Sequence, residues 1–162
     1  MFVPVTEEAA IRSVASLAAT IWREHYTPII GAAQVEYMLS HFQSAEAIAH
    51  QIQAEGYRYY LIEASGNTVG YLAVQRRGDV LFVSKLYLLR SRRGRGLGRE
   101  AMTLLESLAR SSGCDRLELT VNKHNRGSIA FYEAAGFEKG EGVVMDIGGG
   151  FVMDDYVMRK NI

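Results

Sequence analysis

A short cationic segment rich in glycine lies near the middle of the chain. An apolar, β-branched run precedes it, and apolar residues at helical spacing follow it, so a strand leads through a turn into a helix. Glycine lets a ligand approach the backbone, arginine pairs with phosphate oxygens, and a helix N-terminus favours an anion. The segment is therefore predicted to hold a phosphate group. Its four arginines and three glycines are Arg90, Arg92, Arg93, Arg95, Gly94, Gly96 and Gly98.

Two common nucleotide-binding patterns fail at this turn. A P-loop needs Lys followed by Ser or Thr after its last glycine, but Arg99 and Glu100 stand there. A dinucleotide-binding fingerprint needs a third glycine, and Arg99 or Ala101 occupies that position, depending on which glycine starts the pattern. The pattern that remains is R-x-x-G-x-G, which begins at Arg93.

Composition narrows the class of protein. A length of 162 residues favours one domain, and the 18 basic residues balance 18 acidic ones, which argues against a general nucleic-acid binder. A single cysteine, Cys114, excludes an intrachain disulfide and suits a reducing compartment. Because the sequence shows no basic leader, no metal-site spacing and no apolar run of bilayer length, we expect a cytoplasmic protein without metal, membrane or nucleic-acid partners.

The remaining patterns predict an α/β chain with the element order ααα-βββ-α-β-α-ββ, after a short extended segment at residues 2–5. The first helix should begin at a Thr6 cap and break at His25–Pro28, and Ser44 should cap the third. A hairpin turn is predicted at Gly66-Asn67. The strands are expected at 57–64, 69–75, 80–89, 117–121, 137–147 and 151–158, and the later helices at 96–112 and 127–135.

A second motif follows the fifth predicted strand. It reads Asn122-x-x-Asn125, then Ser128 to Glu133, then Gly136-Phe137. With the glycine turn, this order resembles the GCN5-related N-acetyltransferase (GNAT) family and its N-x-x-A-x-x-F-Y-x-x-x-G-F pattern. Ser128 departs from the usual alanine and would add a hydroxyl donor. The resemblance covers residues 57–160 well, and residues 1–56 only in outline.

The resemblance implies a fold and an activity. The fold would be a single GNAT-like domain over 1–162, with a mixed, mostly antiparallel sheet flanked by helices and a splay between its fourth and fifth strands. Residues 1–56 would form a helical substrate-side cap, and residues 57–162 the sheet and the acetyl-CoA site. The activity would be acetyl transfer from acetyl-CoA, as co-substrate, to a primary amine by direct attack in a ternary complex. Family members often dimerise, so a homodimer is one expected assembly.

The resemblance also implies the donor-site residues. Tyr132 matches the tyrosine that protonates the CoA sulfur, a role that suits a phenol, and Phe131 beside it should pack in the core. The residues expected to bind acetyl-CoA are Leu86, Tyr87 and Leu88 at the pantetheine arm, Arg93, Gly94, Arg95, Gly96, Leu97 and Gly98 at the pyrophosphate, and Asn125 and Ser128.

The general base is less clear from the residues. Many relatives carry a glutamate on the strand before the turn, where this chain has Phe82, Val83 and Ser84. A water held by Ser84 would relay the proton, and Glu63 and Asp155 are the other candidates.

The acceptor is expected to meet Trp22, His25 and Tyr26 from the helical region and Asp146 from the last hairpin, because aromatic and acidic groups suit a cation. The helices and the chain's ending look like a subgroup that includes bacterial polyamine acetyltransferases, so a small amine is the first expectation. Two alternatives stay open: the acceptor is a protein lysine or N-terminal amine, or the chain is a CoA-binding module without turnover.

Overall fold

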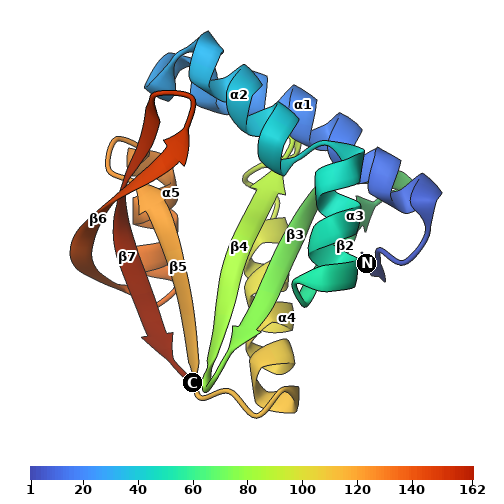
Figure 1. Cartoon of the computed structure of the whole chain (residues 1–162). Helices are drawn as coiled ribbons and strands as arrows, with labels where there is room; N and C mark the ends of the chain where they lie inside the picture. The colour runs from blue at the N-terminus through green and yellow to red at the C-terminus, as the bar shows by residue number, and fades with distance from the viewer. The chain divides into compact units, whose positions relative to one another are not determined.

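The helices and strands follow one another in the predicted order. The computed structural model describes all residues, 1–162, and its strands form one sheet in the order β1-β2-β3-β4-β5-β7-β6 (Figure 1). The sheet is mixed, with β4 and β5 parallel, and five α-helices flank it, which confirms the predicted α/β class. The elements are β1 (Phe2–Pro4), α1 (Glu8–Ile30), α2 (Ala32–Phe42), α3 (Ala45–Ala54), β2 (Tyr57–Ala64), β3 (Asn67–Arg77), β4 (Val80–Leu88), a 3-10 turn η1 (Arg90–Arg92), α4 (Leu97–Ser111), β5 (Arg116–Asn122), α5 (Arg126–Ala134), β6 (Glu138–Gly148) and β7 (Phe151–Asn161).

The chain divides into two compact units. Unit 1 comprises residues 1–75 and 85–97, and unit 2 comprises residues 76–84 and 98–162. The expected boundary between cap and sheet, at residue 56, lies inside unit 1. Strand β4 belongs to both units, because it crosses from one to the other after Ser84. The glycine turn ends unit 1, and its last glycine, Gly98, opens the second segment of unit 2.

Unit 1 packs three helices with the strands β1, β2 and β3. Helices α1, α2 and α3 contact one another, and α3 contacts β2 (Figure 1). Apolar residues on the inner faces are fully buried, among them Val14, Ile21 and Ile48. Ser44 caps α3 by accepting a hydrogen bond from the Ala47 N–H at 3.1 Å, as predicted.

Helix α1 does not break where the sequence suggested. It continues through Pro28 to Ile30 and ends at Gly31, whose φ is 88°. Proline lacks the N–H that would bond four residues back, so the carbonyl of Glu24 has no partner in its own helix. The Arg90 guanidinium donates to that carbonyl at 3.4 Å, which explains how the proline is tolerated.

Two local predictions are also wrong. Glu7, and not Thr6, stands at the N-cap of α1, and no side chain caps the helix there. The β2–β3 hairpin turns at Ser65-Gly66, with φ values of 52° and 77°, and not at Gly66-Asn67. Asn67 instead pairs with Ala64 as the first residue of β3. The register of the strands fixes which two residues must adopt positive φ.

Unit 2 packs α4 and α5 on one face of its strands. Lys160 of β7 shows which face, because its Nζ donates to Glu106 of α4 and to the Ala135 carbonyl at the end of α5, both at 2.6 Å. Lys160 pairs with Leu117 of β5, so Leu117, Leu119 and Val121 lie on this helix-covered face by alternation. All three are buried. Figure 1 shows α5 behind these strands.

The parallel pairing between β4 and β5 is short. It joins Val80, Leu81 and Phe82 to Arg116, Leu117 and Glu118. Both strands continue in the same unit, to Ser84 on β4 and Asn122 on β5, without further pairs in this register. The β4–β5 pairing therefore ends at Phe82 and Glu118, in agreement with the predicted splay between the fourth and fifth strands.

Candidate functional site

The glycine turn exposes its backbone at the start of a long helix. Gly94 and Gly96 have φ values of 76° and 82°, which L side chains rarely adopt, and no atom lies within 4 Å of a Cβ built at either position. Helix α4 then begins at Leu97 and runs for 15 residues. Its first N–H groups lack helical partners and lie at the positive end of the dipole. Open glycine backbone at this place suits an anionic ligand.

The arginines of the turn divide into two kinds. Arg93 donates through Nε to the Leu88 carbonyl at 3.3 Å, and Arg90 holds the Glu24 carbonyl, so both brace the turn within unit 1. The Arg95 side chain, in contrast, is exposed and makes no hydrogen bond or ion pair. The Arg92 side chain, which is half-buried, makes no such bond either, so Arg95 is the exposed guanidinium of the predicted cradle that remains available to phosphate oxygens.

Gly98 has another reason to be glycine. A Cβ at this position would lie 2.8 Å from Cε1 of Phe131 on α5, closer than real contacts allow. The expectation that Phe131 packs in the core is wrong, because the ring is 37% exposed and covers Gly98. This contact sets the start of α4 against α5 within unit 2.

A glycine that sequence reasoning missed shapes the end of β4. A Cβ at Gly70 of β3 would overlap the Tyr87 carbonyl oxygen and lie 2.9 Å from Cδ2 of Leu88. The Leu89 N–H then donates to the Val69 carbonyl at 2.8 Å. Gly70 therefore positions the segment Leu86, Tyr87 and Leu88, which is predicted to contact pantetheine. The available signal was a glycine inside a strand, which marks a close backbone approach.

Asn125 and Ser128 form the N-terminal cap of α5. The Asn125 side chain is 3% exposed, and its Oδ1 accepts from the Ser128 N–H at 3.4 Å. The Asn125 carbonyl accepts from the Ile129 N–H at 3.1 Å. Because Oδ1 is engaged, the predicted bond to acetyl-CoA would come from the Nδ2 amide.

Tyr132 lies one turn further along α5 and is 8% exposed. Its ring packs edge-on against Phe137, with centroids 5.4 Å apart, and against Phe131 at 5.3 Å. The ring is thus held from two sides by its own motif. A fixed phenol of this kind fits the predicted acid, and its role stays a prediction.

The three candidate bases differ in their surroundings. Ser84 is half-buried on β4, just beyond the last β4–β5 pair. Glu63 lies on β2 in unit 1, where its backbone exchanges hydrogen bonds with Met1 of the N-terminus. Asp155 lies on β7, is 1% exposed and has an Oδ1 without a hydrogen-bond partner. Burial raises the pKa of Asp155 to about 6, against a Thr120 hydrogen bond that lowers it.

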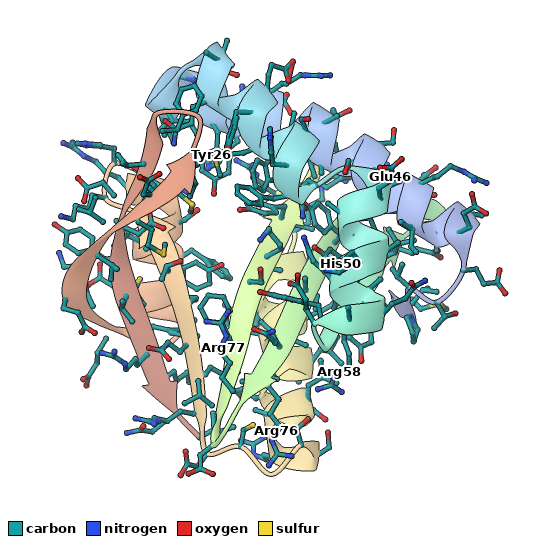
Figure 2. All side chains as sticks on the ribbon, viewed as in Figure 1. Tyr26, Glu46, His50, Arg58, Arg76 and Arg77 are labelled. Atoms are coloured by element: carbon teal, nitrogen blue, oxygen red, sulfur yellow. The ribbon has the colours of Figure 1, made fainter.

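The predicted acceptor residues of α1 form an aromatic cluster with Tyr87 in unit 1. Tyr26 is labelled in Figure 2; its hydroxyl lies 3.0 Å from that of Tyr87, and His25 meets its ring edge-on. Trp22 is 2% exposed and gives its N–H to the Tyr71 hydroxyl at 3.1 Å. Trp22 therefore supports Tyr26 and Tyr87 through ring contacts at 5.4 and 5.6 Å.

Asp146, the fourth predicted acceptor residue, belongs to unit 2. It is exposed near the end of β6, and its Oδ1 accepts from the Gly148 N–H at 2.8 Å. This bond shapes the hairpin through Gly148, Gly149 and Gly150, which all have positive φ. Contact of Asp146 with an acceptor stays a prediction.

No group of three or more His, Cys, Asp or Glu side chains is arranged to hold a metal ion. No helix has both the length and the apolar character needed to span a membrane.

Comparisons with known proteins agree with this geometry. An uncharacterized N-acetyltransferase of Escherichia coli (strain K12), YjgM, is 30% identical over 87 residues, covering 51% of this chain and 52% of that protein. The chain spans about half the length of the curated relatives it matches.

Solved structures share the fold along the whole chain. The PaiA N-acetyltransferase from Thermoplasma acidophilum, in complex with coenzyme A, has a TM-score of 0.80 at 17% identity and covers 100% of this chain and 99% of its own. A GCN5-related N-acetyltransferase from Rhodopseudomonas palustris has a TM-score of 0.82 at 18% identity, with 100% and 95% covered. The sequence model of the acetyltransferase (GNAT) family matches residues 18–137, which is most of the chain and includes both motifs. The chain therefore belongs to this family.

Proposed function

We propose that this chain transfers the acetyl group of acetyl-CoA to a primary amine, by direct attack in a ternary complex. The observation that carries the proposal is the glycine turn, where open backbone at Gly94 and Gly96 and the unpaired Arg95 stand at the start of α4. Acetyl-CoA fits this turn because its pyrophosphate needs N–H donors and a guanidinium. The coenzyme A in the structure of a protein with the same fold supports the choice of donor.

The remaining donor-site residues would have separate tasks. The end of β4 would offer backbone groups to the pantetheine arm and to the thioester oxygen, which gains charge as the amine attacks. Tyr132 would protonate the sulfur as it leaves, since a phenol is protonated at neutral pH. Tight ring packing on Phe137 and Phe131 would keep its hydroxyl in place.

For the acceptor, we propose a small amine such as a polyamine. The aromatic residues Tyr26 and Tyr87 present two hydroxyls side by side in unit 1, and aromatic faces attract cations. A protein lysine or N-terminal amine is the second candidate acceptor. A CoA-binding module without turnover is the alternative from another class, and it is favoured by Phe82, Val83 and Ser84 standing where relatives carry a carboxylate.

An acceptor screen tests the proposal. Release of CoA thiol from acetyl-CoA would be followed with spermidine, simple alkyl amines, lysine peptides and peptides with free N-termini. Turnover with spermidine or an alkyl amine supports the proposal, and turnover with peptides alone supports the second acceptor. Stabilisation of the protein by CoA without turnover on any amine would leave only the binding module.

A further inference from the structure

The face of unit 2 opposite α4 and α5 carries polar side chains on three strands. On β5 these are Glu118, Thr120 and Asn122, which alternate with the buried residues of the helix-covered face. On β7, Asp155 pairs with Asn122, and Arg159 pairs with Glu118 and donates to its Oε1 at 3.1 Å. Directly opposed residues project from the same face of a sheet, so Asp155 lies on the face that Glu118 and Thr120 share.

Ser84 of β4 projects from this face too. Phe82 pairs with Glu118, and the strand period of two gives Ser84 the same side as Phe82. Counting two residues along each strand places Ser84 level with Thr120, and Thr120 pairs with Val157, two residues from Asp155. Strands β5 and β7 are one strand spacing apart here, about 5 Å, whereas β4 no longer pairs with β5 at Ser84. Ser84, Thr120 and Asp155 thus form one polar stripe across three neighbouring strands.

Asp155 is the one acid of this stripe that is buried without full compensation. Its side chain is 1% exposed, Thr120 bonds to it, and Oδ1 has no partner. A buried carboxylate oxygen without a donor is costly, and a catalytic role is one of the explanations for such a group in a native structure. Asn122, opposite Asp155, also begins the loop that leads to the Asn125 cap and Tyr132.

We propose that Asp155 is the general base of the transfer, acting through the polar stripe in place of the carboxylate that β4 lacks. The inference rests on the proposed function. Acid and base would then lie on opposite faces of unit 2, with Tyr132 on α5 and Asp155 across the sheet. This arrangement suits acetyl transfer, because the amine approaches the carbonyl carbon from one side while the thiolate departs from another.

The proton transfers balance. The acceptor ammonium loses a proton, through water held along the stripe, to the Asp155 carboxylate and becomes an amine. Its nitrogen forms the C–N bond to the thioester carbon, the C–S bond breaks, and the sulfur takes the proton of Tyr132. The amide nitrogen releases its second proton to solvent, and solvent reprotonates Tyr132 and removes the proton from Asp155.

The charges around Asp155 come from each neighbouring element. Asp154 on β7 opposes its ionisation, and Lys123, after β5, favours it. Lys123 is already paired with Asp154 at 2.9 Å. Further along the same face, Glu118 is paired with Arg159, and Arg77 lies over the Phe82 ring, 3.8 Å from its centroid (Figure 2). The carboxyl therefore has no ion-pair partner of its own.

The test compares Asp155→Asn with the wild-type chain on two amines of similar size. Ethylamine is protonated at neutral pH, and 2,2,2-trifluoroethylamine is not. For ethylamine, wild-type kcat/KM should fall below about pH 6 and stay level above it, as the base titrates. For the variant, kcat/KM with ethylamine should be about 100-fold lower than wild type at pH 7 and should rise steadily with pH, because only the free amine reacts. For trifluoroethylamine the loss should stay within about threefold, since no proton needs removal before attack.

Two further variants separate catalysis from structure. Glu118→Gln removes a carboxylate from the same face and should leave the level region unchanged. Thr120→Val removes the hydrogen bond that favours the ionised Asp155, so the fall in rate should move to higher pH. This variant also tests the proposal should Asp155→Asn fail to fold. If Asp155→Asn keeps the pH-independent kcat/KM above about pH 6, or loses activity equally with both amines, Asp155 is not the base. Either result leaves the proposed function standing. A wild-type chain that binds acetyl-CoA but acetylates no amine overturns the proposed function itself.

Discussion

At the scale of single residues, the Tyr132 hydroxyl is the sharpest test of the donor site. Tyr132→Phe keeps the ring that packs on Phe137 and Phe131, so folding and acetyl-CoA affinity should change little. Loss of a general acid should lower kcat about 100-fold. Single-turnover kinetics and acetyl-CoA titration would measure the two quantities separately. Tyr156→Phe, which removes a hydroxyl on β7, is the control, and an unchanged rate in Tyr132→Phe would exclude the acid role.

The buried Asp155 carboxyl should also show in the stability of the protein. Its pKa of about 6 in the folded state lies above the ordinary value of 3.8. The folded chain therefore holds this proton more tightly, and the stabilisation it gives is complete below about pH 4 and lost as pH rises through about 6. A difference of this size corresponds to about 3 kcal/mol. Asp155→Asn should raise the urea midpoint at pH 7 and not at pH 4. Equal effects at both pH values would mean that Asp155 does not have a raised pKa in the folded protein.

Residue positions were predictable from the sequence where a motif fixes them, and less so where packing decides. The pattern from Asn125 to Phe137 located the α5 cap and the Tyr132 ring within one helix. It could not show that Phe131 covers Gly98, because that contact joins two helices. The sequence also could not favour Asp155 over Glu63 as the base, since burial depends on which strands become neighbours.

At the scale of elements, Gly70 should control the position of the β4 end. Alanine there would overlap the Tyr87 backbone, which cannot move away as a flexible side chain could. We expect Gly70→Ala to destabilise the protein by about 3 kcal/mol and to weaken acetyl-CoA binding. Gly127→Ala is the matched control, because no atom lies within 4 Å of its Cβ and alanine favours the first turn of α5. Denaturant unfolding and CoA titration of both variants would show whether the effect is specific to β3 and β4.

Element type was predictable from periodicity, while element ends depended on tertiary contacts. The strand at Tyr57–Ala64 lies where the aromatic and β-branched run stands. Helix α1 outlasts its predicted end because Arg90, 62 residues after Pro28 in the sequence, satisfies the carbonyl that the proline releases. Local rules treat proline as a helix breaker and contain no information about so distant a donor.

At the scale of the whole molecule, the sheet order follows from simple rules of connection, but the division into units does not. Sequential strands paired as antiparallel neighbours from β1 to β3, and the α4 connection gave the parallel β4–β5 pair. The chain passes from one unit to the other inside β3 after Gln75, inside β4 after Ser84, and after Leu97, and no composition shift marks these boundaries.

Binding of acetyl-CoA at the glycine turn should stabilise the folded protein. A ligand that binds only the folded state at 100 times its Kd adds about 2.7 kcal/mol to the free energy of unfolding. Arg95→Ala removes the exposed, unpaired guanidinium of the turn, and loss of a charged hydrogen bond should raise the Kd about tenfold. The thermal shift with acetyl-CoA should shrink accordingly, and added salt should weaken binding less in this variant than in the wild type. Arg110→Ala, at the other end of α4, should bind as the wild type does. Equal loss in both variants would mean that the net charge of the helix, and not the turn, holds the pyrophosphate.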